Sequence, residues 1–169
     1  MGHSEHKKNA LKKLRVGIIT VSTTRTLAED KSGRWMKKRA EKEGHDVVVY
    51  RIIADDEQLI AQTVGQIVAD MAPDTLLITG GTGLNPTDVT IEAVRPLFEK
   101  ELTAFGTLFT LLSFEEIDSA AILSRATAGI IKKTTVFCLP GSLNACKLAC
   151  RELIFPEAGH IAAHVNKEL

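Results

Sequence analysis

LLITGGTGLNPTDVT, which runs from Leu76 to Thr90, is the stretch that decides the fold of this chain. Its first residues are aliphatic or β-branched and therefore favour a β-strand. The strand ends at a glycine-rich loop, which permits positive φ and leaves backbone N–H groups free to converge on an anion. This loop consists of Gly80, Gly81, Thr82 and Gly83. The stretch therefore predicts a phosphate-binding loop, although glycine loops also form plain strand-to-helix turns.

Asp88 follows this loop and adds a carboxylate to the predicted phosphate site. Two neighbouring anions repel each other unless a divalent cation neutralises both. Proteins bind Mg²⁺ through one or two carboxylates together with substrate phosphates. The loop and its acid therefore predict a magnesium site. The alternative is that Asp88 only stabilises the N-terminus of a helix, by about 0.3 to 1 kcal/mol.

The composition is that of a single domain with no global electric field. The chain has 169 residues, with 21 basic and 21 acidic side chains and a formal net charge of +0. We therefore expect neither nucleic acid nor an anionic membrane as a partner. No apolar run approaches the roughly 20 residues that cross a bilayer, and the first residues lack a hydrophobic signal core. We expect a cytoplasmic protein with a mobile basic arm at residues 1–13 and one domain at residues 14–169.

Strands and helices alternate in the first half of the chain. Nearly continuous apolar runs predict strands at Leu14–Val21, Val47–Ile53 and Thr75–Ile78. Helical spacing of apolar residues predicts helices from Ser32 to about Gly44 and from Leu59 to about Met71. This order is typical of right-handed βαβ crossovers, and it predicts an α/β fold whose mostly parallel sheet has helices on both faces.

The second half of the chain is less regular. Helices are expected at Thr90 to about Phe98, Ala104–Leu112, Asn144 to about Leu153, and from Pro156 onward. Two β-rich runs on either side of Lys132 and Lys133 predict a hairpin or a paired edge and core strand. The second run ends in a loop of Pro140, Gly141 and Ser142, where N–H groups would face the same edge as the glycine loop. Alternatively, Ser142 is simply a helix cap.

Polar residues directly follow several predicted strands. Ser22 follows the first strand, Asp56 the second and the glycine loop the third. In parallel sheets, ligands lie beyond the carboxyl ends of the strands, so the fold would gather these residues at one edge. Asp55 is interpreted as a solvated neighbour. Asp56 and Asp88 are therefore the candidate ligands of Mg²⁺.

The expected site lacks the motifs of common nucleotide-binding folds and lacks a protein base. No Walker lysine lies in the loop, and no acid follows at the spacing of a Rossmann fingerprint. A phosphate nucleophile would explain the missing base, because its second pKa is about 6 and it is largely ionised at neutral pH. Positioning and a metal ion would then suffice.

Other residues have both a functional and a structural interpretation. Ser124 and Arg125 lie between two apolar segments, where Arg125 would bind a phosphate or carboxylate, or else form a structural salt bridge. The three cysteines are expected in the core, rather than in disulfides or metal sites. His160 and His164 have a ligand-like helical spacing, but an amphipathic or interface helix is the favoured interpretation.

A set of motifs in one order resembles a known family. The motifs are VGIITVS, DKSG, DDEQ, LLITGGTG, TDVT, AFG, LLSFEEI, AILSRATAG and LPGS. From Arg15 onward the chain resembles the molybdenum cofactor biosynthesis proteins of the MoaB and MogA family, and LLSFEEI resembles the MoaB members. The resemblance implies a three-layer α/β/α molybdopterin-binding fold and a homo-oligomer, either a trimer or a hexamer. Other enzymes of the same pathway are further candidate partners.

The resemblance also implies an activity. Relatives use ATP and Mg²⁺ to adenylylate molybdopterin and release pyrophosphate. By motif, Asp56 and Asp88 match the acidic pair for metal binding and catalysis, and Gly80–Gly83 match the phosphate-contacting loop. Matches to pterin or nucleotide contacts are Ser124, Arg125, Pro140, Gly141 and Ser142. We therefore expect a molybdopterin adenylyltransferase with Mg²⁺ as cofactor, in which Ser22 and these loops bind ATP and molybdopterin.

Two positions depart from the family pattern. Thr23 follows Ser22 where an aspartate is common, and Thr107 follows the FG dipeptide where a glutamate is common. Two other functions stay open, namely a non-catalytic oligomer that carries or protects the pterin and a generic nucleotide-binding regulator. Retention of both acids favours the enzyme.

Overall fold

A six-stranded sheet in the order β2-β1-β3-β6-β5-β4 forms the centre of the computed structural model, which describes residues 10–167. The parallel strands are β2 (Asp46–Ile53), β1 (Arg15–Val21), β3 (Thr75–Thr79) and β6 (Thr134–Leu139). The antiparallel strands at one side are β5 (Thr127–Ile131) and β4 (Lys100–Glu101). The mostly parallel sheet and the β5–β6 hairpin confirm the prediction.

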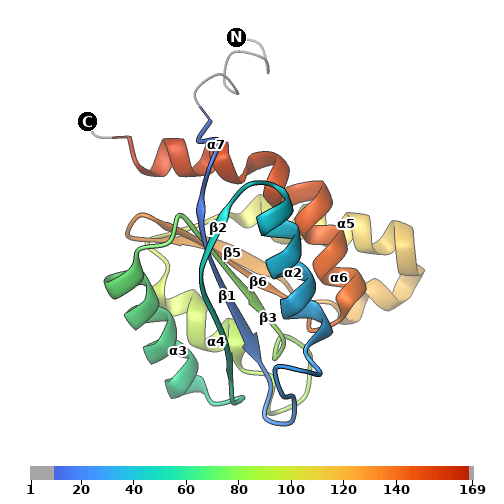
Figure 1. Cartoon of the computed structure of the whole chain (residues 1–169). Coiled ribbons are helices and arrows are strands. Elements are labelled where there is room, and N and C mark those ends of the chain that lie inside the picture. The colour runs from blue at the N-terminus through green and yellow to red at the C-terminus, as the bar shows by residue number, and fades with distance from the viewer. Residues whose placement is uncertain (1–9, 168–169) are drawn as a thin grey trace.

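Helices cover both faces of this sheet (Figure 1). One face carries α3 (Glu57–Gln66) and α4 (Thr90–Val94). The other carries α2 (Lys31–Lys42), α5 (Thr103–Ile117), α6 (Leu143–Leu148) and α7 (Phe155–Val165). Short π-helical segments are Ile67–Met71 and Ala149–Ile154, and 3-10 turns are Arg95–Leu97 and Asp118–Leu123. The three α/β/α layers are therefore confirmed.

Alternation along β1 divides the core into two layers. Val16 and Ile18 belong to the apolar cluster under α2, α5, α6 and α7, whereas Ile19 and Val21 belong to the cluster under α3 and α4. A strand buried on both faces needs apolar residues at nearly every position, which is why its sequence shows no polar alternation.

The start of α2 differs from the prediction, because Asp30 rather than Ser32 is the N-cap. The buried carboxylate of Asp30 accepts hydrogen bonds from Gly33 N at 2.9 Å, Thr20 Oγ1 at 2.6 Å and Tyr50 Oη at 2.6 Å. Burial, reinforced by the Asp30 carboxylate, raises the pKa of the Tyr50 phenol strongly. The DKSG motif therefore holds the start of α2 against β1 and β2.

Other boundaries also differ. Helix α5 continues to Ile117 rather than ending at Leu112, because no proline or glycine interrupts its apolar sequence. The two exposed residues of β4 carry no strand pattern and were not predicted. Most of the predicted arm at residues 1–13 lies outside the described residues, but Leu11 N donates to Gly159 O of α7 at 3.0 Å. Among residues 10–167, no helix is long and apolar enough to cross a membrane.

Candidate functional site

A cavity of about 410 Å³, here called the loop cavity, opens at the carboxyl ends of β1, β3 and β6. Its lining consists of Val21, Ser22, Arg25, Asp55, Gly80, Gly81, Thr82, Gly83, Asp88, Leu123, Ser124, Arg125, Pro140, Gly141 and Ser142. The structure therefore brings together the site residues predicted from the sequence, with one exception. That exception is Asp56, and its neighbour Asp55 takes its place.

The glycine loop presents a row of unpaired donors. Within residues 10–167, the N–H groups of residues 81–84 donate to no acceptor. Gly80 and Gly81 have φ values of +96° and +63°, which favour glycine, and a Cβ on Gly80 would lie 2.3 Å from Val21 O. Consecutive free N–H groups in such a turn form a cradle for an anion.

Arg125 braces this loop instead of pointing at a free anion site. Its Nε donates to Thr82 O at 2.8 Å and Gly83 O at 3.1 Å, and its guanidinium pairs with Glu92 at 2.6 Å. The hydrogen bond with Arg125 lowers the pKa of Glu92, and the same bond raises the pKa of Arg125. The C=O and N–H of a trans peptide point in opposite directions, so the N–H groups of Gly83 and Leu84 face away from Arg125. The salt bridge expected as the structural alternative for this arginine is therefore present.

Two carboxylates flank the loop. Asp88 Oδ2 accepts from Asn85 N at 2.9 Å, and a Cβ on Gly83 would lie only 2.6 Å from that oxygen. Asp55 Oδ2 accepts from Thr23 N at 2.7 Å and from Thr23 Oγ1 at 2.8 Å. Asp55 Oδ1 faces the loop, because a Cβ on Gly81 would lie 3.3 Å from it. In the described part of the chain, the Oδ1 atom of each aspartate accepts no hydrogen bond.

The prediction that Asp56 joins this group differs from the observed geometry. Asp56 is the N-cap of α3, and its Oδ1 accepts from Leu59 N at 2.7 Å. An N-cap carboxylate bonds to N–H groups of the first helical turn, which turns it away from the sheet edge. Asp55, interpreted as a solvated neighbour, faces the loop cavity instead. An aspartate directly before a helix beginning with Glu57 was a capping signal that favours this arrangement.

The loop after β1 adds a residue that the sequence did not single out. Ser22 Oγ accepts from Thr24 N at 3.4 Å and from Arg25 N at 3.2 Å, so Ser22 shapes the turn that carries Arg25. Arg25 lines the loop cavity and its Nη1 lies 3.4 Å from Gly141 O. No motif marks an arginine at this position, so only the fold reveals it. Ser142 lines the cavity too, and it caps α6 by accepting from Ala145 N at 3.2 Å.

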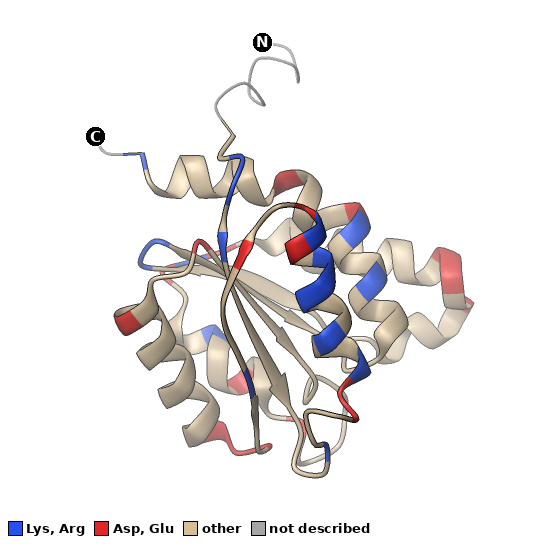
Figure 2. Cartoon of the chain, viewed as in Figure 1, with Lys and Arg blue, Asp and Glu red and all other residues tan. Residues whose placement is uncertain are grey.

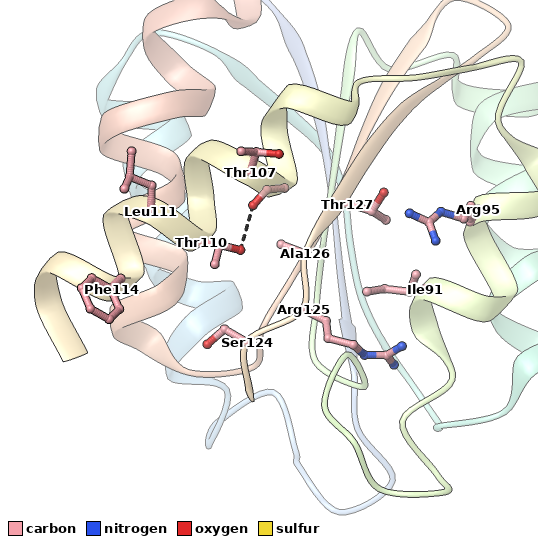
Figure 3. A pocket seen from close by; sticks show the side chains of 11 residues that line it. Ile91, Arg95, Thr107, Thr110, Leu111, Phe114, Ser124, Arg125, Ala126 and Thr127 are labelled. Atoms are coloured by element: carbon pink, nitrogen blue, oxygen red, sulfur yellow. Dashed lines mark hydrogen bonds between the residues drawn. The ribbon is translucent and has the colours of Figure 1, made fainter. Parts of the chain in front are cut away.

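A second cavity of about 730 Å³, here called the α5 cavity, adjoins the first through Ser124 and Arg125, which line both. Figure 3 shows Phe114 and the other α5 side chains on one side and Ile91 on the other, with residues 124–127 between them. The hydroxyl of Thr110 donates to Gly106 O at 2.9 Å, so its oxygen is left as an acceptor. Apolar walls with a few polar atoms are typical of small-molecule sites.

The three cysteines contribute packing, as predicted. Cys138, Cys146 and Cys150 are all buried and free. Burial raises the pKa of Cys138 to about 12 and that of Cys146 to about 11, so neither thiol is poised for metal binding. On α7, His160 and His164 place their Nε2 atoms 2.9 Å apart.

Basic and acidic side chains gather in different parts of the molecule, although the formal net charge is +0. Figure 2 shows basic residues gathered along α2 and acidic residues at the start of α3, beside the carboxyl end of β2.

Among residues 10–167, no group of three His, Cys, Asp or Glu side chains is placed to hold a metal ion alone. Asp55 and Asp88 nevertheless fit Mg²⁺, which takes one or two carboxylates and completes its shell with phosphates and water.

Comparisons with known proteins agree with this fold. The model of the probable molybdopterin binding domain matches residues 17–160. Molybdenum cofactor biosynthesis protein B of Bacillus subtilis is 46% identical over 169 residues, covering 99% of both chains. A probable molybdopterin adenylyltransferase of Methanocaldococcus jannaschii is 39% identical, covering 96% of this chain and 99% of the relative.

Solved structures give the same result. A crystal structure of molybdenum cofactor biosynthesis protein B superposes with a TM-score of 0.90 at 43% identity, covering 93% of this chain and 98% of that one. The tungsten cofactor synthesizing protein MoaB from Pyrococcus furiosus superposes with a TM-score of 0.83 at 38% identity, covering 94% and 100%. The chain therefore belongs to the molybdopterin-binding domain family and, within it, groups with the molybdenum cofactor biosynthesis B proteins.

Proposed function

We propose that this protein acts in molybdenum cofactor biosynthesis as a molybdopterin adenylyltransferase, consuming ATP and releasing pyrophosphate. One observation carries the proposal. The free N–H groups of residues 81–84 lie between two carboxylates, Asp55 and Asp88, that each keep an oxygen available. The name of the relative from Methanocaldococcus jannaschii, a probable molybdopterin adenylyltransferase, supports the same reaction.

The proposed step is a transfer between two phosphates. An oxygen of the molybdopterin phosphate attacks the α-phosphorus of ATP, and a new P–O–P bond forms. The bond from the α-phosphorus to its bridging oxygen breaks, and the electron pair leaves with pyrophosphate. No protein base is needed, because a phosphate monoester with a second pKa of about 6 is already largely ionised at neutral pH. The chain's contribution is to bind and orient both phosphates.

The glycine loop supplies the donors for that orientation. The N–H groups of residues 81–84 would bind phosphate oxygens, while Arg125 keeps the loop in one conformation by holding its carbonyl groups. Donors fixed before substrate arrives need no reorganisation during the reaction. Asp55, held by Thr23, and Asp88 would bind Mg²⁺. When bound, this ion would neutralise phosphate charge and polarise the reacting phosphorus centre.

The α5 cavity would accept the heterocycle attached to one of the phosphates. It begins where the loop cavity ends, at Ser124 and Arg125, and its walls include Ile91, Leu111 and Phe114. A planar ring would bury against these apolar side chains, and threonine oxygens would accept hydrogen bonds from ring N–H groups. Thr107, which departs from the common glutamate, lies in this lining and not beside the reacting phosphates.

Three isosteric variants test the proposal. Asp88→Asn and Asp55→Asn should each lower the rate of AMP transfer to molybdopterin by about a hundredfold or more while leaving stability nearly unchanged. Asp56→Asn should retain both stability and transfer, because asparagine is as good an N-cap as aspartate. Transfer is measured as pyrophosphate release and adenylylated product, and stability by urea unfolding. If Asp56→Asn stops transfer while Asp55→Asn does not, the assignment of the acids is reversed.

A non-catalytic pterin carrier gives a different result in the same experiments. Molybdopterin would bind with an affinity independent of ATP and Mg²⁺, and no pyrophosphate would appear in the wild type. Calorimetry with and without Mg-ATP therefore separates the two functions. A generic nucleotide regulator would bind ATP and no pterin.

We further propose that the protein self-associates, as a trimer or hexamer, through the outer face of α5 and the turn after it. This surface exposes Leu108, Ile117 and Ile122, with Ile122 83% exposed, and it borders the α5 cavity at Leu111 and Phe114. Contiguous apolar side chains of this kind mark protein interfaces. Leu108→Glu should reduce the solution mass to that of a monomer, whereas Leu59→Glu on the outside of α3 should leave it unchanged. An unchanged mass for Leu108→Glu would exclude this surface.

A further inference from the structure

The loop cavity contains two arginines, and only one of them is available to a ligand. Arg125 is engaged with Glu92 and two carbonyl groups. Arg25 is exposed, and no carboxylate in the described part of the chain pairs with it. Among residues 10–167, the guanidinium makes one hydrogen bond, from Nη1 to Gly141 O, which is long at 3.4 Å. We propose that Arg25 is the residue that directly binds phosphate oxygens of the substrate. This inference rests on the proposed function.

The turn after β1 positions Arg25 for this role. Ser22 Oγ accepts hydrogen bonds from the N–H groups of Thr24 and Arg25, which fixes the backbone from which the guanidinium extends. The neighbouring Thr23 is anchored to Asp55 through two hydrogen bonds, so the loop is tied at its centre as well. Ser22 is therefore a positioning residue for Arg25, although the sequence predicted it as a direct contact.

Releasing Arg25 toward a ligand leaves no orphaned group behind. Gly141 O also accepts from Ser32 Oγ at 3.0 Å, so that carbonyl stays satisfied when the arginine moves. Gly141 also lies against the glycine loop, since a Cβ on it would be 3.3 Å from the Gly80 Cα and 3.8 Å from Arg25 Nη1. The guanidinium therefore starts within reach of the cradle formed by residues 81–84.

The charges that line the loop cavity favour a role for the Arg25 guanidinium in binding phosphate. Asp55 and Asp88 both face the loop, and the charge of Arg125 is offset by Glu92. A polyphosphate entering beside two carboxylates needs positive charge beyond that of one divalent ion. Arg25 supplies that charge with a planar fork of N–H donors, which matches phosphate geometry better than a lysine does.

The test measures binding of inorganic tripolyphosphate with Mg²⁺, and of inorganic phosphate, by calorimetry on the full chain. Arg25→Ala should weaken tripolyphosphate binding roughly tenfold to a hundredfold, and Arg25→Lys should recover only part of it. Arg151→Ala removes the same charge from an exposed position in the segment Ala149–Ile154, which lines neither cavity, and should leave binding unchanged. A loss confined to tripolyphosphate would place Arg25 on the nucleotide phosphates, whereas an equal loss for inorganic phosphate would place it on a monoester.

Ser22→Ala separates positioning from contact. It should weaken tripolyphosphate binding in the wild-type background and have no further effect in Arg25→Ala, because both changes act through one side chain. Unchanged binding in Arg25→Ala would overturn the inference, even if AMP transfer occurs and the proposed function stands. The opposite result is also possible: the protein transfers no AMP, but its binding of tripolyphosphate depends on Arg25. That result would refute the proposed reaction and leave the proposed role of Arg25 intact.

Discussion

A methyl group placed on Gly83 would test the link between the glycine loop and Asp88. The added Cβ would lie 2.6 Å from Asp88 Oδ2, whereas ordinary contact begins at 3.4 Å, so the carboxylate would have to move by about 0.8 Å. Gly83 does not have a positive φ, so alanine fits its backbone conformation. The displacement would break the 2.9 Å hydrogen bond from Asn85 N, and that N–H is free to bond to water instead.

The expected outcome is a loss of activity without a loss of stability. Losing one exposed hydrogen bond lowers the free energy of unfolding by about 1 kcal/mol. Replacing glycine by alanine restricts the unfolded chain and raises the free energy of unfolding by about 0.4 to 1 kcal/mol. A misplacement of about 1 Å at a reacting centre costs about a hundredfold in rate, which is about 2.7 kcal/mol of transition-state stabilisation. Gly83→Ala should therefore unfold in urea within about 1 kcal/mol of the wild type while AMP transfer falls about a hundredfold.

Gly65→Ala is the matched control. Gly65 lies within α3 and no atom would come within 4 Å of its added Cβ. This variant should gain about 0.8 to 1 kcal/mol in stability, because alanine is the better helix former, and should transfer AMP at the wild-type rate. The reasoning is refuted if Gly83→Ala transfers AMP within twofold of the wild type, or if it loses more than about 3 kcal/mol of stability.

Asp30→Ala should lower the free energy of unfolding by about 3 kcal/mol or more, because it leaves three donors, two of them buried, without an acceptor. Tyr50→Phe should lower it by about 1 kcal/mol, and equal losses in urea unfolding would contradict this ranking. Arg125 lowers the pKa of Glu92 below 4.5, so their bond stabilises the fold above that pH and is lost as the pH falls through the lowered value. Glu92→Gln should therefore flatten the fall in Tm as the pH drops below 4.5, and a fall parallel to that of the wild type would count against this prediction. Burial raises the pKa of Cys138 to about 12, so native protein should not react with a thiol reagent at pH 8, whereas all three cysteines should react in denaturant.

The sheet and its carboxyl edge could be predicted because they follow from residues close together in sequence. Runs such as Leu14–Val21 are apolar at nearly every position, which only a strand buried on both faces requires. Once three such strands alternate with helices, chain topology brings Ser22 and the glycine loop to one edge. The short strand β4 had no such signal, since Lys100 and Glu101 are exposed and are held only by pairing with β5.

The individual roles at the site depended on orientation, which the sequence does not encode locally. Asp55 and Asp56 are neighbours of the same chemistry, and only the start of α3 decides which one caps the helix. Arg25 and Arg125 likewise have the same side chain, so their chemistry alone does not distinguish their roles. Contacts with Glu92 and two carbonyl groups, between 33 and 43 positions away in the chain, decide that Arg125 is structural.

The anchoring of the glycine loop by Arg125 limits how this site could be transplanted. A contiguous peptide from Thr79 to Asp88, grafted onto another α/β scaffold, would leave behind a guanidinium that lies 43 positions beyond the carbonyl of Thr82. The freed carbonyls would turn to solvent, and the N–H groups would sample many directions before meeting an anion. A working graft therefore needs at least two segments of the chain, one from the glycine loop through Glu92 and the other with Arg125.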